Sequence, residues 1–201
     1  MDNGDTRSDA ELLSLSIEGD ESAFFLLYER LKHNLFRYAY YMTGSKSTAE
    51  EITQDVFMTL LSKAGKYHEP QGDVAGFAFG IVKNLVRRIR RCENGFESLS
   101  AEESAVSPNL MADIDPVDAQ LVRNELADQV QMAVASLPIH YREAVVLCDL
   151  CELSYSEAAA RLRCSIGTVR SRLNRAHNVL ARKLKPLQKT RTVGLREGCL
   201  I

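Results

Sequence analysis

The stretch SYSEAAARLRCSIGTVRSRLNRAHNVLARKLK, residues 154–185, decides how this chain folds and what it can bind. It holds two runs of helical periodicity separated by a short turn at residues 163–165. Ser154 and Glu157 have the S-x-x-E spacing of a capping box, and Ser165 is placed to cap the second run. Two helices joined by so short a turn are typical of a helix-turn-helix, although this turn lacks the usual glycine.

The second helix of this pair has two contrasting faces. At 3.6 residues per turn, one face collects the apolar residues Ile166, Val169, Leu173, Ala176 and Leu180. We expect this apolar stripe to pack on the preceding helices. The opposite face carries Arg170, Ser171, Asn174, Arg175 and Asn178. Arginines beside hydrogen-bonding side chains are what phosphates and base edges in a DNA groove require.

The charge around this helix is strongly one-sided. From Arg161 to Arg196 there are eleven Lys or Arg residues and no Asp or Glu, although the whole chain has a formal net charge of −2. A solvated helix usually mixes both signs, because i,i+4 pairs stabilise it. Uncompensated positive charge of this size favours nucleic-acid binding over a merely solvated basic face.

Bulk composition limits the remaining possibilities. The 201 residues are 45% hydrophobic, which suffices for one or two packed domains. No apolar run approaches the roughly 20 residues of a membrane span, and the acidic N-terminus is unlike a secretion signal. Five irregularly spaced cysteines do not resemble a disulfide framework. We therefore expect a cytoplasmic protein without membrane insertion.

Helical periodicity dominates the rest of the chain, and no segment alternates like a strand. Residues 9–18, 21–42, 47–65 and 74–91 read as helices, and Ser47 with Glu50 predicts a capping box for the third. Further helices are expected at 119–137 and 138–150. Residues 92–118, between the helices expected at 74–91 and 119–137, carry seven acidic and no basic side chains, which is typical of a linker. The sequence thus predicts an all-α protein of two small helical domains.

A second basic cluster ends the helix expected at residues 74–91. It consists of Lys83, Arg87, Arg88, Arg90 and Arg91. Alone, such a cluster also fits a membrane-surface helix or a helix C-terminus that favours cations. Together with the basic helix near the other end of the chain, it favours one nucleic acid contacted at two places.

These segments resemble the extracytoplasmic-function group of bacterial sigma factors, in the sigma-70 class. The stretch from Ser136 to Leu180 resembles region 4 of that family, most clearly in Gly167-Thr168-Val169-Arg170-Ser171-Arg172-Leu173. AEEITQDVFMTLL resembles region 2.2, and FAFGIVKNLVRRIRR resembles regions 2.3 to 2.4. The resemblance implies region 2 at residues 9–91, an acidic linker at 92–118 and region 4 at 119–185. Residues 186–201 form a tail with no assigned role.

The resemblance also implies a function. Such a protein binds the core RNA polymerase, through a coiled coil of the β′ subunit and the β flap, and directs promoter-specific initiation of transcription. It reads the −10 and −35 elements of promoter DNA, helps to melt the duplex and is commonly controlled by an anti-sigma factor. The resemblance implies no enzymatic activity, no cofactor and no metal.

Three sets of site residues follow from matching the family's motifs. The polymerase-binding set is Gln54, Asp55 and Phe57. The −10 and melting set is Tyr67, Lys83, Asn84 and Arg87, with the loop at residues 67–73 taking an extruded base. The −35 set is Thr168, Arg170, Ser171, Asn174 and Arg175. Without the family, we would read Phe57 as a core residue and Asp55 as a solvated acid. The alternative for Asn84 is an ordinary surface amide.

The chain departs from the family's pattern at three positions. Phe77 stands where Trp is frequent, Gly80 where Arg is frequent, and Glu152 where Gly is common. The first two concern the melting surface, and the third concerns the turn before the helix-turn-helix.

Two other classes of protein remain open at this point. Cys148 and Cys151 form a C-x-x-C, which in an enzyme could be a redox pair or half of a zinc site, but we prefer small buried cysteines. An ordinary helix-turn-helix repressor or activator would bind duplex DNA without polymerase, usually as a dimer. Basic residues in both halves of the chain favour the sigma factor.

Overall fold

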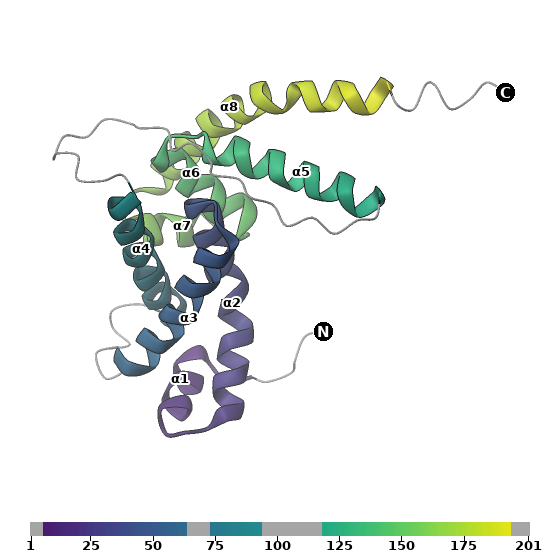
Figure 1. Ribbon diagram of the computed structural model, residues 1–201. Helices are drawn as coiled ribbons and strands as arrows, with labels where there is room; N and C mark the ends of the chain where they lie inside the picture. The colour runs from purple at the N-terminus through teal and green to yellow at the C-terminus, as the bar shows by residue number, and fades with distance from the viewer. Residues whose placement is uncertain (1–5, 64–72, 94–117, 194–201) are drawn as a thin grey trace. The chain divides into compact units, whose positions relative to one another are not determined.

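The computed structural model describes residues 6–63, 73–93 and 118–193, and these ranges contain helices and no strand (Figure 1). The chain divides into two compact units, residues 1–100 (unit 1) and 101–201 (unit 2). The prediction of an all-α protein with two helical domains is confirmed. The predicted linker at 92–118 and the tail at 186–201 fall largely outside the described side chains.

Unit 1 is built around one long helix. Its helices are α1 (Asp9–Ile17), α2 (Glu21–Thr43), α3 (Lys46–Lys63) and α4 (Val74–Glu93), and α2 contacts each of the other three. α2 buries one stripe of side chains, spaced mostly by three or four residues. Its buried members are Ala23, Leu27, Leu31, Leu35, Tyr38, Ala39 and Met42. Because the stripe faces α1, α3 and α4 together, unit 1 has a single core.

The start of α3 differs from the prediction. The backbone N–H of Thr48 donates to the Ser45 hydroxyl at 3.2 Å, and that of Ala49 donates to the Ser45 carbonyl at 3.0 Å. Ser45 is therefore the capping residue, and the predicted capping box of Ser47 is wrong. The reason is Gly44, whose φ of +80° ends α2 in the left-handed conformation. The turn it makes is so tight that α3 begins before Ser47.

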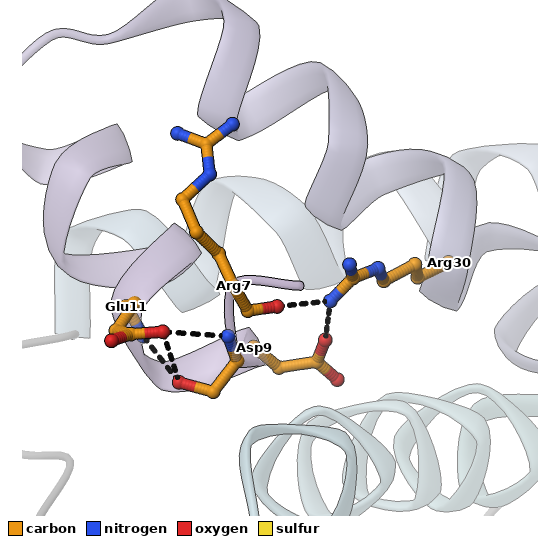
Figure 2. Close-up of polar contacts among 5 residues, drawn as sticks. Arg7, Asp9, Glu11 and Arg30 are labelled. Atoms are coloured by element: carbon orange, nitrogen blue, oxygen red, sulfur yellow. Dashed lines mark hydrogen bonds and ion pairs between the residues drawn. The ribbon is translucent and has the colours of Figure 1, made fainter. Parts of the chain in front are cut away.

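The N-terminal helix is fastened by a small polar cluster (Figure 2). Ser8 and Glu11 form a capping box, with the Ser8 N–H donating to the Glu11 carboxylate at 2.7 Å. Arg30 on α2 donates to the Arg7 carbonyl at 2.8 Å and to the Asp9 carboxylate at 2.9 Å. The ion pair is part-exposed and contributes less than about 1 kcal/mol, so its main effect is to orient α1 against α2.

Unit 2 contains the predicted helix-turn-helix and the helices that support it. Its elements are α5 (Asp118–Ala135), α6 (Ile139–Val145), the π-helical turn η3 (Val146–Leu150), α7 (Tyr155–Leu162) and α8 (Ile166–Val193). α8 contacts α5, α6 and α7. The helix predicted at 138–150 widens at its end, where the Cys151 N–H donates to the Val146 carbonyl five residues back at 2.8 Å.

Among the described residues of unit 2, two non-glycine residues have positive φ, namely Glu152 at 58° and Arg163 at 53°. Glu152 follows the π-helical turn, and Arg163 ends α7. A side chain with a Cβ pays roughly 1–2 kcal/mol in the left-handed region. Glu152 stands where the family commonly has glycine. Its side chain therefore strains a left-handed backbone that glycine would adopt without strain.

Replacing Glu152 with glycine is expected to stabilise unit 2 by about 0.5–1 kcal/mol, because the Cβ strain is relieved and only partly offset by the entropy of the unfolded chain. Thermal unfolding of the full chain measures the gain. Glu152→Ala keeps the Cβ and is the matched control, for which we expect no comparable gain. Equal stabilisation by both variants would mean that the carboxylate, not the backbone, causes the strain.

Candidate nucleic-acid interface

The N-terminal half of α8 is held by its apolar stripe. Val169, Leu173 and Ala176 are buried, and Leu180 is half-buried. The prediction that Ile166 also packs is wrong, because 46% of its surface is exposed. Ile166 is the first residue of α8, one turn before the part of the stripe that the neighbouring helices cover.

The opposite face of α8 is solvent-exposed from Arg170 to Asn178. Arg170, Ser171, Asn174, Arg175 and Asn178 are all exposed. At the helix start, the Thr168 N–H donates to the Ser165 hydroxyl at 3.1 Å, which confirms Ser165 as the cap. The Thr168 hydroxyl lies 2.9 Å from that of Ser165 and is half-buried. The structure thus brings all five predicted −35 residues onto one helix, and four of them are exposed.

Polar contacts with α6, with η3 and with the residue after α5 fix the rotation of α8 about its axis. Arg175 lies 3.5 Å from the Tyr141 hydroxyl of α6, which raises the pKa of the guanidinium. His177 Nε2 lies 2.6 Å from the Asp149 carboxylate of η3. Lys183 donates to the Ser136 hydroxyl, just after α5, at 2.7 Å. These contacts determine which side of α8 is presented to a partner.

One basic residue of unit 2 has a structural role that the sequence did not reveal. Arg142 is 5% exposed, and its Nη2 donates to the carbonyls of Ala135 and Leu137, the latter at 3.2 Å. It therefore satisfies carbonyls at the C-terminal end of α5, where a cation also complements the helix dipole. The available signal was its spacing, since Arg142 shares a helix face with the buried Val145 and Val146.

The second basic surface lies on α4 in unit 1. Asn84 and Arg87 are exposed and Lys83 is half-buried, while Val82 and Val86 are buried on the other side. The exposed side also carries Arg88 and Arg91. Asn84 and Arg87 therefore lie one turn apart on one face. Tyr67 and most of the predicted melting loop lie outside the described residues.

The predicted polymerase-binding residues separate into two groups on α3. Gln54 and Asp55 are exposed. Phe57 is only 4% exposed, and its ring centroid lies 4.8 Å from that of Tyr28 and 6.1 Å from that of Phe24, both on α2. Phe57 thus supports the helix from the core. Met58, which the sequence analysis missed, is 69% exposed and lies on the same side of α3 as Asp55 and Gln54. The signal was the helical period, because Met58 falls beside Gln54 and Asp55 and not on the buried stripe of Ile52, Val56 and Leu60.

The cysteine pair has the character of packed thiols. Burial raises the pKa of the half-buried Cys148 to about 11, so its reactive thiolate is scarce at neutral pH. Cys151 is buried. Within the described ranges, no three His, Cys, Asp or Glu side chains gather as a metal site. None of the helices described is long and apolar enough to cross a membrane.

Comparison with protein families matches both units separately. Residues 27–95 match the family model "Sigma-70 region 2", and residues 127–177 match "Sigma-70, region 4". The first match includes α3 and α4, and the second includes the helix-turn-helix.

Individual relatives cover most of the chain. The "ECF RNA polymerase sigma factor SigM" of Mycobacterium tuberculosis (strain H37Rv) is 33% identical over 179 residues, covering 89% of this chain and 85% of the relative. The "ECF RNA polymerase sigma-E factor" of Escherichia coli (strain K12) is 29% identical over 189 residues, covering 90% and 96%.

Two solved structures share the fold. CnrH in complex with the cytosolic domain of CnrY has a TM-score of 0.65 and 23% identity, covering 90% of this chain and 99% of the other. The sigma factor RpoE in complex with the anti-sigma factor NepR, from Bartonella quintana, has a TM-score of 0.56 and 24% identity, covering 81% and 96%.

Proposed function

The chain belongs to the extracytoplasmic-function group of sigma-70 factors, and from this premise we propose which surfaces carry its function. As a sigma factor it directs RNA polymerase core to promoters. We assign residues 9–91 to region 2, 92–118 to the linker and 119–185 to region 4. Because the polymerase works in the cytoplasm, we expect the protein there.

The observation that carries the proposal is the exposed face of α8. Four of its polar side chains, Arg170, Ser171, Asn174 and Arg175, stand opposite a buried stripe that fixes the helix. A recognition helix in the major groove needs this arrangement, since arginine and asparagine make bidentate contacts with base edges. Thr168 lies at the helix N-terminus, where the backbone favours a phosphate. We propose that this face reads the −35 element.

In unit 1 we propose that α4 contacts the −10 region. Asn84 would contact the promoter strand, while Lys83 and Arg87 would neutralise nearby phosphates. Tyr67 belongs to the proposed base-capturing loop through the resemblance alone. This assignment is supported by the exposure of Asn84 and Arg87 and by the basic residues that share their face of α4.

We propose that the exposed side of α3 binds the β′ coiled coil. Asp55 supplies negative charge, Gln54 can form hydrogen bonds, and Met58 offers an apolar contact. Protein interfaces typically combine an apolar centre with a polar rim in this way. Phe57 would act indirectly by holding α3 in place. Contact of unit 2 with the β flap and control by an anti-sigma factor remain part of the proposal, the latter supported by the fold shared with the Bartonella quintana RpoE, which was solved with NepR.

Transcription in vitro tests the proposed function directly. The purified chain is added to bacterial core polymerase on a library of promoter fragments, and transcripts are sequenced. We expect initiation at a subset of fragments that share two elements at −10 and −35. Binding to duplex DNA without polymerase, and no transcription with it, would instead support the repressor alternative.

Arg175→Ala is expected to weaken recognition of the −35 element by about 1–3 kcal/mol, because a base-edge contact is lost. The measurement is the affinity of the reconstituted holoenzyme for promoters that carry every single-base change in the element. We expect discrimination to relax at one position. Arg163→Ala removes an equal charge from the turn and is the control, with no change of discrimination. A uniform loss with Arg175→Ala would contradict base reading by this residue.

A further inference from the structure

Helix α8 continues well past the part that matches sigma-70 region 4. The match ends at residue 177, whereas the helix runs to Val193 as one continuous element (Figure 1). Within the extension, the side chains of Arg182 and Lys185 are exposed. We call residues 178–185 the basic extension.

The exposed side of the basic extension is aligned with the proposed −35 face. Along α8 the exposed residues Ser171, Asn174, Asn178, Arg182 and Lys185 follow one another at spacings of three or four. Residues so spaced lie on one face of an α-helix. The Arg182 Nε donates to the Asn178 carbonyl at 3.2 Å, which directs the guanidinium along this face.

The rotation of the basic extension is fixed from the opposite side. Leu180 and Leu184 are half-buried, and Lys183 donates to the Ser136 hydroxyl. Lys183 is thereby directed toward the end of α5 and away from Arg182 and Lys185. The basic extension consequently has Arg182 and Lys185 on the face of Asn174, while Lys183 lies on another side.

We propose that the basic extension binds backbone phosphates of the duplex beside the −35 element, where it reads no bases; this rests on the proposed function of α8. Asn174 and Lys185 are eleven residues apart, or about 16 Å along the axis. A recognition helix contacts base edges with its N-terminal residues, so Lys185, three turns further along a straight axis, lies past the contacted bases. There the duplex presents phosphates.

Duplex DNA is the occupant that the surface favours. The basic face is continuous with the proposed DNA face, and residues 161–196 contain no acid that would repel phosphates. Such contacts provide affinity through counterion release without sequence information. An acidic segment of a partner protein could bind Arg182 and Lys185 wherever they lay on α8, so it would not explain why they are aligned with the −35 face.

The test uses the holoenzyme and the double variant Arg182→Gln/Lys185→Gln. Promoter affinity is measured by fluorescence anisotropy over a range of salt concentrations. We expect the slope of log K against log salt to fall in magnitude by about 2, near 0.9 for each lost phosphate contact. Discrimination between the −35 element and its single-base variants should stay as in the wild type. Lys183→Gln removes a charge from another side and should leave the slope unchanged.

A second arm shortens the duplex so that it ends flush with the −35 element on the side toward the basic extension. On this shorter DNA, the wild type and the double variant should bind equally. An unchanged salt slope on the full duplex, or a weaker affinity for core polymerase alone, would overturn the inference, the latter by indicating a protein partner. If the wild type itself shows no dependence on the −35 element, the proposed function fails, and the inference fails with it.

Discussion

Asp55→Arg is expected to raise the Kd for core polymerase at least 100-fold while the protein remains folded. We expect the negative charge of Asp55 to face a basic partner surface, so the variant places like charges together, at a cost of several kcal/mol. Asp55 is exposed on α3, and its substitution leaves the core intact. The measurement is the affinity of fluorescently labelled chain for core polymerase without DNA, with circular dichroism to confirm the fold.

Unit 1 offers a matched control on another helix. Glu29 is exposed on α2 and lies outside the docking side of α3 that Gln54, Asp55 and Met58 form. Glu29→Arg makes the same change of charge and should leave the affinity within a few-fold of the wild type. Equal losses for both variants would indicate long-range electrostatics, and no loss for Asp55→Arg would reject the docking surface.

Arg142→Met is expected to destabilise unit 2 by about 2–4 kcal/mol. Methionine preserves much of the apolar packing but cannot donate to the carbonyls of Ala135 and Leu137, which then lose a charged donor in a buried place. Native-state hydrogen exchange measures the loss, and we expect faster exchange throughout α6 and α8. Amides of α2 in unit 1 serve as an internal reference.

Arg170→Met is the control for this prediction. Arg170 is exposed on α8, and its replacement should change stability by less than about 0.5 kcal/mol. If Arg142→Met left exchange in unit 2 unchanged while impairing promoter binding, Arg142 would belong to the DNA interface and not to the end of α5.

The faces of α8 show how far sequence alone can go. Val169, Leu173 and Ala176 were predicted to pack and are buried, while Arg170 and Asn174 were predicted to be exposed and are. The prediction succeeds because the period of the helix is a local property, fixed by backbone geometry. It fails at Ile166, where burial depends on how far neighbouring helices reach.

The candidate site on α3 shows where local rules stop. Gln54, Asp55 and Phe57 came as one motif, but the structure separates them, since Phe57 meets Phe24 and Tyr28 of α2. Those partners lie about thirty residues earlier, and no periodicity within α3 identifies them. In the same way, the role of Ser45 as the cap follows from the left-handed Gly44 before it.

The sequence by itself determined the helical class, the position of the helix-turn-helix and the basic face of α8, because spacing and charge are properties of neighbouring residues. Only the tertiary structure decided which polar residues are enclosed. Arg142 and Arg170 are the same residue type in the same unit, yet one ends in the core and the other in solvent. The difference arises because burial of a guanidinium depends on carbonyls brought to it by another helix, which is a long-range consequence of packing.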